Sequence, residues 1–186
     1  MNTNVLTTGK LISLLQMFGV PVENWGKGES KDVSHFYKEI DAGESYLRID
    51  QKGLARVVEI VKMYFKSPQP GEKVVLKEIF QILPNGRKKI RNQEPGGKIQ
   101  TGEKSTSALE REIFEKLDLL PAYYKYKSLP VEVEFRPSKS YPGIICQYVI
   151  HRFEIVPNIG THILQREFEI VEKNGTVLHF EWVPEK

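Results

Sequence analysis

A single stretch of helical periodicity lies between two series of strand-like segments, and this order restricts the folds open to the chain. Residues 105–117 carry apolar side chains at helical spacing, at Leu109, Ile113 and Leu117. Period-two or solid apolar segments occupy 46–49, 54–65 and 73–83 before this helix, and 131–135, 144–156, 168–170 and 178–182 after it. Two more helical patterns, at 11–18 and 32–42, precede all the strands. The order predicts an α+β fold, in which helices pack on a mixed sheet.

The first 44 residues are predicted to form a helical N-terminal extension to a sheet domain that spans 45–186. The apolar side chains of the first helix recur along one stripe: Leu11, Ile12, Leu14, Leu15 and Phe18. A segment of this length cannot bury such a stripe by itself, so we expect it to dock on the sheet domain or on a second subunit. Trp25, between the two helices, is expected to anchor their packing.

Composition places the chain among ordinary globular proteins: 40% of its 186 residues are hydrophobic, 27% are charged, and the formal net charge is +3. No segment approaches the roughly 20 apolar residues of a membrane-spanning helix, and the N-terminus has no signal-peptide core. The only cysteine, Cys146, lies in an apolar run and excludes a disulfide framework, which favours a cytoplasmic location. No membrane partner is therefore expected.

Two groups of polar residues outside the central helix are interpreted as structural. Arg87, Lys88, Lys89 and Arg91 are interpreted as a basic run on the predicted hairpin turn, just before Gly96-Gly97, and could hold phosphates or nucleic acid. A solvated turn is the favoured interpretation, because a nucleic-acid module usually carries a larger basic excess. The four histidines (His35, His151, His162 and His179) have no ligand-pair spacing, which argues against a zinc site.

The central helix carries an acidic stripe next to its apolar face. Gly96-Gly97 precedes it and permits a tight backbone, Ser105 or Thr106 is expected to be its N-cap, and it should end near Leu117. On a helical wheel Glu112, Glu115 and Lys116 flank the apolar seam. Carboxylates spaced in this way can converge on one hard cation, although most charged helix faces are only solvated.

At these residues the chain resembles the Nudix hydrolase family, whose motif is G-x5-E-x7-R-E-U-x-E-E-x-G-U, where U is a bulky apolar residue. Seven of the nine fixed positions match in register: Gly97, Glu103, Arg111, Glu112, Ile113, Glu115 and Leu119. Lys116 stands at the last glutamate and Asp118 at the last glycine. The resemblance covers roughly residues 45–186 and implies an α/β/α sandwich.

The resemblance also implies a reaction, the Mg²⁺- or Mn²⁺-dependent hydrolysis of a nucleoside diphosphate linked to another group. The family's metal ligands correspond to the Gly97 carbonyl, Glu112 and Glu115, while Glu103 and Arg111 would orient them. No organic cofactor is implied. Lys116 cannot bind a metal while protonated, because it offers only donors. Two functions therefore stay open: a divergent hydrolase weakened by Lys116, and a catalytically inactive module that binds a nucleotide or a protein partner.

Several features of the function lie beyond the motif. Glutamates outside the helix could supply a further ligand or a base, and the sequence does not choose among Glu132, Glu134, Glu154, Glu167 and Glu169. Neither the substrate nor the oligomeric state can be deduced. For Lys116 itself the spacing predicts a partly buried ion pair with Glu112, four residues earlier, so that the lysine partly replaces a metal ion.

Overall fold

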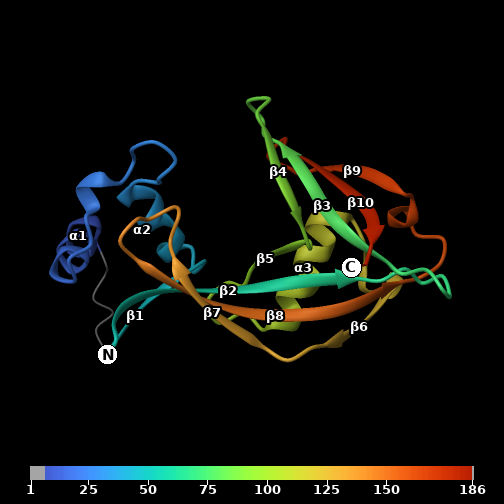
Figure 1. The fold of residues 1–186 in the computed structure, drawn as a ribbon, viewed down its shortest axis with the longest axis horizontal. Coiled ribbons are helices and arrows are strands. Elements are labelled where there is room, and N and C mark those ends of the chain that lie inside the picture. The colour runs from blue at the N-terminus through green and yellow to red at the C-terminus, as the bar shows by residue number, and fades with distance from the viewer. Residues whose placement is uncertain (1–6, 186) are drawn as a thin grey trace. The chain divides into compact units, whose positions relative to one another are not determined.

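The observed elements follow the predicted order of helices, strands, one central helix and further strands (Figure 1). The computed structural model describes residues 7–185, so residues 1–6 of the predicted extension lie outside its description. The helices are α1 (Thr8–Met17), α2 (Val33–Asp41) and α3 (Ser105–Leu117), with short 3-10 turns at Val22–Asn24, Pro121–Tyr123 and His162–Leu164. The strands are β1 (Tyr46–Asp50), β2 (Gly53–Phe65), β3 (Val74–Ile82), β4 (Lys88–Gln93), β5 (Gly96–Lys98), β6 (Tyr124–Ser128), β7 (Glu132–Pro137), β8 (Ile145–Pro157), β9 (Glu167–Val171) and β10 (Val177–Pro184).

The strands form two sheets, of which one is mixed. In the six-stranded sheet the order is β1-β2-β8-β6, with β5 paired to β2 and β7 paired to β8. β1 is antiparallel to β2 and β6 is antiparallel to β8, whereas β2 and β8 run in the same direction (Figure 1). The four-stranded sheet, β4-β3-β10-β9, is antiparallel throughout. The predicted α+β class with a mixed sheet is confirmed.

The chain divides into two compact units, and β2 and β8 each run through both. Unit 1 comprises Met1–Glu59, Lys98–Gly102 and Val133–Val149, and unit 2 comprises Ile60–Gly97, Glu103–Glu132 and Ile150–Lys186. Unit 1 thus holds α1 and α2, while unit 2 holds α3 and the four-stranded sheet. The division into an extension of 44 residues and a sheet domain stays a prediction, since residues 45–59 belong to the same unit as α1 and α2.

The apolar stripe of the first helix is buried inside unit 1. Its cluster of buried side chains consists of Leu11, Leu15, Val20, Val22, Trp25, Phe36, Tyr141 and Ile144. The Trp25 indole donates a hydrogen bond of 2.9 Å to the Pro142 carbonyl, and its ring centroid lies 5.1 Å from that of Tyr141. The predicted docking of the helices on a later part of the chain is therefore confirmed, except that Phe18 stays 40% exposed at the end of α1.

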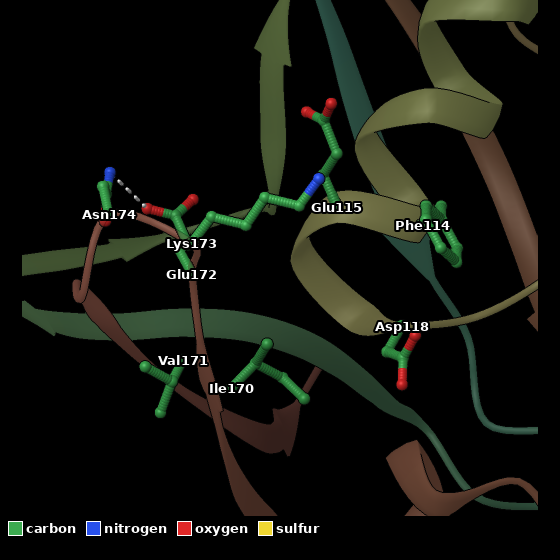
Figure 2. A pocket seen from close by; sticks show the side chains of 8 residues that line it. All are labelled: Phe114, Glu115, Asp118, Ile170, Val171, Glu172, Lys173 and Asn174. Atoms are coloured by element: carbon green, nitrogen blue, oxygen red, sulfur yellow. Dashed lines mark hydrogen bonds between the residues drawn. The ribbon is translucent and has the colours of Figure 1, made fainter.

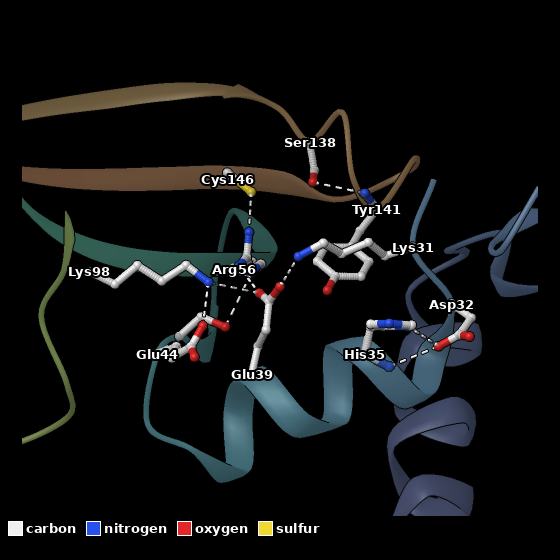
Figure 3. A network of polar contacts seen from close by, with 11 residues as sticks. Lys31, Asp32, His35, Glu39, Glu44, Arg56, Lys98, Ser138, Tyr141 and Cys146 are labelled. Carbon is white, nitrogen blue, oxygen red and sulfur yellow. Dashed lines mark hydrogen bonds and ion pairs between the residues drawn. The ribbon is translucent and has the colours of Figure 1, made fainter. Parts of the chain in front are cut away.

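A buried ion-pair network joins α2 to the strands of unit 1 (Figure 3). The carboxylate of Glu39 contacts Lys31 Nζ at 2.6 Å, Lys98 Nζ at 3.4 Å and the buried guanidinium of Arg56. Arg56 also donates to Ser45 Oγ at 3.2 Å. Burial raises the pKa of Glu39, but the hydrogen bond from Lys31 and the charges of Arg56 and Lys98 outweigh it and lower this pKa to about 2.

The core of unit 2 surrounds α3. The helix buries Ala108, Leu109, Ile113 and Leu117, so the predicted apolar seam is confirmed. At its C-terminal end the Leu117 carbonyl lies 2.8 Å from His162 Nε2, and the neighbouring Ile163 carbonyl accepts a bond of 2.7 Å from Trp182 Nε1. With 13 residues, α3 is the longest helix in the described part, where no helix is long and apolar enough to cross a membrane.

Removing the charge of Glu39 should weaken the fold and change its acid sensitivity. Because the folded-state pKa of Glu39 lies below its ordinary value of 4.5, this carboxylate stabilises the fold above about pH 4.5, and its contribution is lost as the pH falls toward 2. Glu39→Gln should lower the free energy of unfolding at pH 7 by about 3 kcal/mol, since Arg56 stays buried without its main partner.

Urea unfolding between about pH 2 and 7 measures both effects. The variant should lose less stability on acidification than the wild type. Glu44→Gln is the matched control, because Glu44 also contacts Lys98, at 2.6 Å, but is 40% exposed. Equal acid sensitivity in Glu39→Gln and the wild type would contradict the assignment.

Candidate functional site

The ends of α3 show how the acidic helix is positioned. The helix begins at Ser105, and its N-cap is Lys104, which makes no side-chain capping bond. The prediction of Ser105 or Thr106 as N-cap is therefore wrong: both residues already have helical geometry and lie inside the first turn. The helix ends at Leu117 as predicted, and Asp118 follows in the left-handed region with φ of 48°. Aspartate is among the few residues other than glycine that tolerate this backbone conformation.

Gly97 and Glu112 are brought into direct contact. Gly97 lies in β5, and a Cβ atom built on it would overlap the carboxylate of Glu112. Glu112 is only 6% exposed. A side chain of any size at position 97 would force this carboxylate to move. The glycine is therefore required for close approach of the carboxylate to the backbone, and the structure places these two predicted metal ligands side by side.

Arg111 holds the carboxylates around it. Its Nε and Nη2 donate to the two oxygens of Glu103 at 2.9 and 3.0 Å, which is a bidentate pair. Its Nη1 donates to Glu112 Oε1 at 2.8 Å and to Glu115 Oε2 at 3.4 Å. The hydrogen bonds to Glu103 are the main reason why the pKa of Arg111 is raised. The structure thus brings together all the predicted side chains, and Arg111 connects Glu103 to both carboxylates of the helix.

Lys116 lies among the carboxylates, as predicted. Its Nζ is 3.7 Å from Glu112 Oε2 and 3.6 Å from Glu172 Oε1, and only 16% of its side chain is exposed. The predicted ion pair with Glu112 is confirmed. Glu172 was missed by the sequence analysis. It follows β9 just before the turn at Asn174-Gly175, and a hairpin position far along the chain gives no periodic signal.

A pocket of about 490 Å³ adjoins Glu115 (Figure 2). Its walls come from the C-terminal end of α3 and the residue after it, and from the end of β9 and the hairpin that follows: Phe114, Glu115, Asp118, Ile170, Val171, Glu172, Lys173 and Asn174. Phe114 is 49% exposed and Val171 is 67% exposed. The pocket therefore offers an apolar wall next to carboxylates, and Glu115, with 54% of its side chain exposed, is the helix carboxylate most accessible from it.

The remaining glutamates considered from the sequence have partners elsewhere. Glu132 pairs with Arg152, Glu134 with Arg136 and Glu154 with Lys66. Glu169 and Glu181 each lie 3.2 Å from a nitrogen of His179. Glu167, His179 and Glu181 form a group whose possible ligand atoms lie within 4.8 Å of one another. This group was missed because its members come from β9 and β10 and meet only across the sheet. Both ring nitrogens of His179 already contact carboxylates, those of Glu169 and Glu181.

The basic run lies on a strand rather than in a turn. Lys88, Lys89 and Arg91 belong to β4, and Lys88 Nζ lies 3.5 Å from the centroid of the Phe80 ring. Arg91 Nε lies 3.0 Å from the buried carboxylate of Glu78. The interpretation of this segment as a solvated turn is therefore wrong for these residues, because the turn ends earlier and antiparallel pairing with β3 begins at Lys88.

The oxygen atoms gathered near Gly97 are of the kind that bind a hard divalent cation. Glu112 and Glu115 supply carboxylate oxygens, which Mg²⁺ prefers, and the backbone of Gly97 lies against the Glu112 carboxylate. Lys116 contributes a positive charge beside Glu112. The carboxylates present are of the kind that can hold a hard divalent cation.

Comparisons with known proteins relate this chain to solved structures only. No protein-family model matches it, and no curated protein does. The chain is similar in fold to an Ap4A hydrolase of C. elegans, with 14% identity over 68% of this chain and 80% of that one and a TM-score of 0.44. It is also similar to the Nudix hydrolase RenU of M. smegmatis, with 15% identity over 75% and 79% of the two chains and a TM-score of 0.40. A Nudix hydrolase of Nitrosomonas europaea matches at 15% identity over 77% and 74%, with a TM-score of 0.35. At these identities and TM-scores the matches do not decide the function of this chain.

Substituting Gly97 should disturb the carboxylate cradle directly. Gly97→Ala forces Glu112 away from the backbone, which should lower the free energy of unfolding by about 2 kcal/mol, as other overpacked sites do. It should also weaken any stabilisation by Mn²⁺. Gly9→Ala on α1 is the control, because a Cβ there meets nothing within 4 Å. Thermal unfolding with and without Mn²⁺ measures both effects, and an unchanged Gly97→Ala variant would contradict the cradle.

Proposed function

We propose that this protein is a divergent Nudix-type hydrolase, dependent on Mg²⁺ or Mn²⁺, that acts on a nucleoside diphosphate linked to another group. The contact between Gly97 and the buried Glu112 carboxylate, with Arg111 bonded to it, is the observation that carries this proposal. A solvated helix face requires neither a glycine without room for a side chain nor a guanidinium shared among three carboxylates. A carboxylate cluster fixed against the backbone is what metal-assisted phosphate chemistry needs.

In this proposal each residue has a separate task. Glu112, Glu115 and the Gly97 carbonyl hold the metal ion, which would neutralise charge on the phosphate oxygens when bound. Arg111 and Glu103 fix the orientation of the two carboxylates through their bidentate pair. The accessible pocket beside Glu115 receives the group attached to the phosphates. Residues 45–186 form the catalytic part and residues 1–44 its extension.

Lys116 favours the alternative function, a catalytically inactive module that binds a nucleotide or a protein. Its ammonium partly neutralises Glu112 and Glu172 and so supplies positive charge where the family has a metal ligand. Such a site can attract a phosphate group without hydrolysing it. A cytoplasmic location remains part of the proposal, because Cys146 is a buried free thiol. Nucleic acid is not a proposed partner, since Lys88 and Arg91 are engaged with Phe80 and Glu78.

A phosphate-release screen tests the proposed activity. The full chain is incubated with nucleotide sugars, dinucleoside polyphosphates and nucleoside triphosphates, with and without Mn²⁺. Hydrolysis that requires the metal and is abolished in Glu115→Gln supports the enzyme. No release from any compound at millimolar metal, together with binding of the same compounds in a thermal-shift assay, would establish the inactive module instead.

Replacing Lys116 separates the two functions further. Lys116→Glu places carboxylates at 112, 115 and 116, and like-charge repulsion should lower the metal-free stability by about 1–3 kcal/mol. Added Mg²⁺ should restore that stability, and the affinity for Mg²⁺ should rise at least tenfold over the wild type. Calorimetric titration and thermal unfolding measure these changes.

Two controls accompany this substitution. Lys116→Met removes the charge without adding a ligand, so it should not gain affinity for Mg²⁺. Lys173→Glu reverses an exposed charge that lines the pocket but does not contact Glu112 in any described pair. If Lys173→Glu raises Mg²⁺ affinity as much as Lys116→Glu, the effect is general electrostatics and the specific role of Lys116 is wrong.

A further inference from the structure

β7 carries an apolar row that stays largely exposed, with the Arg48 guanidinium 5.9 Å from the centroid of the Phe135 ring as its one described ring contact. Its sequence alternates Val133 and Phe135 with charged residues, which is the pattern of a strand with one buried face. In the structure every residue of this strand is exposed, with Val133 at 52% and Phe135 at 58%. Ile145, at 45% exposure, extends the row on the neighbouring strand. A pattern that predicts burial is therefore not satisfied within the described chain.

The same strand has a free backbone edge. Within residues 7–185, β8 is the only strand that pairs with β7. The Ser138 N–H donates to the Ile144 carbonyl at 2.9 Å, so the backbone groups of Arg136 and Glu134, at alternate positions, point the same way. Those of Phe135 and Val133 point outward. An exposed edge of this kind is a template for another strand.

The charged side chains of β7 indicate which strand could pair with its free edge. Glu134 and Arg136 lie on the face opposite to Phe135, where they pair with each other at 3.2 Å in the single chain. The Arg136 guanidinium also lies 4.3 Å from the Tyr148 ring centroid. In an antiparallel pair of identical strands related by a two-fold axis at Phe135, each Glu134 lies opposite Arg136 of the other copy, and the two Phe135 rings meet. An axis at Glu134 would instead oppose two glutamates, and an axis at Val133 would oppose Glu132 to Glu134. Opposite charges and aromatic pairs stabilise directly opposed positions, and like charges destabilise them.

We propose that β7 is a self-association strand, through which two copies of this chain pair antiparallel with Phe135 at the two-fold axis. The partner is a second copy because the strand is complementary to itself in charge and in its apolar row. This inference does not depend on the proposed hydrolase. Two strands of six residues bury less surface than a standard interface, so the dissociation constant should lie in the range of about 10–100 µM.

A charge-exchange series tests both the pairing and its register. Sedimentation equilibrium of the full chain over roughly 1–300 µM should show a monomer–dimer equilibrium. Glu134→Arg and Arg136→Glu should each raise the dissociation constant about tenfold, because each places two like-charged pairs opposite one another. The double variant should restore wild-type association, since it exchanges the partners. Only the register centred on Phe135 predicts this rescue.

Two further variants separate pairing from folding. Phe135→Lys should abolish the dimer, while Ile159→Lys, at a position that is 82% exposed and outside β7, should leave it unchanged. Both should unfold at the wild-type temperature, because neither side chain is buried. A wild type that stays monomeric at 300 µM overturns the proposal and leaves a strand of another protein as occupant. A double variant as weak as the single ones overturns the register.

Discussion

The buried carboxylate of Glu112 is the constraint on which the functional region depends. A carboxylate that is 6% exposed must be compensated, and here the compensation comes from the Arg111 guanidinium at 2.8 Å and the Lys116 ammonium at 3.7 Å. Its position against Gly97 also excludes any side chain on β5 at that point. The helix and the glycine strand therefore meet at this carboxylate, and Lys116 connects it to Glu172 in the hairpin. This is a stronger requirement than an amphipathic helix alone would impose.

Lys116 adds a positive charge to this region, beside Glu112 and Glu172. A metal ion between Glu112 and Glu115 would have to share Glu112 with a lysine that is already partly desolvated. Without a metal ion, the negative charge of this cluster is better neutralised than that of three neighbouring carboxylates, which would repel one another unless a cation were bound. This arrangement is the reason why we expect a reduced affinity for metal at the proposed site. Arg111 remains compatible with either function, because its bidentate bond to Glu103 does not involve the lysine.

Sequence reasoning succeeded where a local pattern determines the structure. The seam of Leu109, Ile113 and Leu117 follows from helical spacing, and the spacing of Glu112 and Lys116 was enough to predict their ion pair. It failed for contacts between residues far apart in the sequence, and for the exact residue at which a helix begins. Glu172 reaches Lys116 only because a hairpin 56 positions later folds beside α3, and no spacing encodes that contact. The N-cap was misplaced by one or two residues, which is the usual uncertainty of a helix boundary, since the observed N-cap is Lys104.

Buried charged side chains have different roles in the two units. In unit 1 the network of Glu39, Arg56 and Lys98 ties α2 to strand residues that are distant in sequence, and every charge in it has a partner. Such a network fixes the position of α2 against the strands of unit 1, because any other position would leave Arg56 buried without a carboxylate partner. In unit 2 the charges gather beside a pocket, with Glu115 accessible and Lys116 withdrawn. A network in which every charged side chain is paired within the protein serves the stability of the fold. A charged cluster beside a pocket, with the carboxylate of Glu115 accessible, can also bind a ligand. This contrast makes α3, rather than the larger network around Glu39, the place where chemistry is expected.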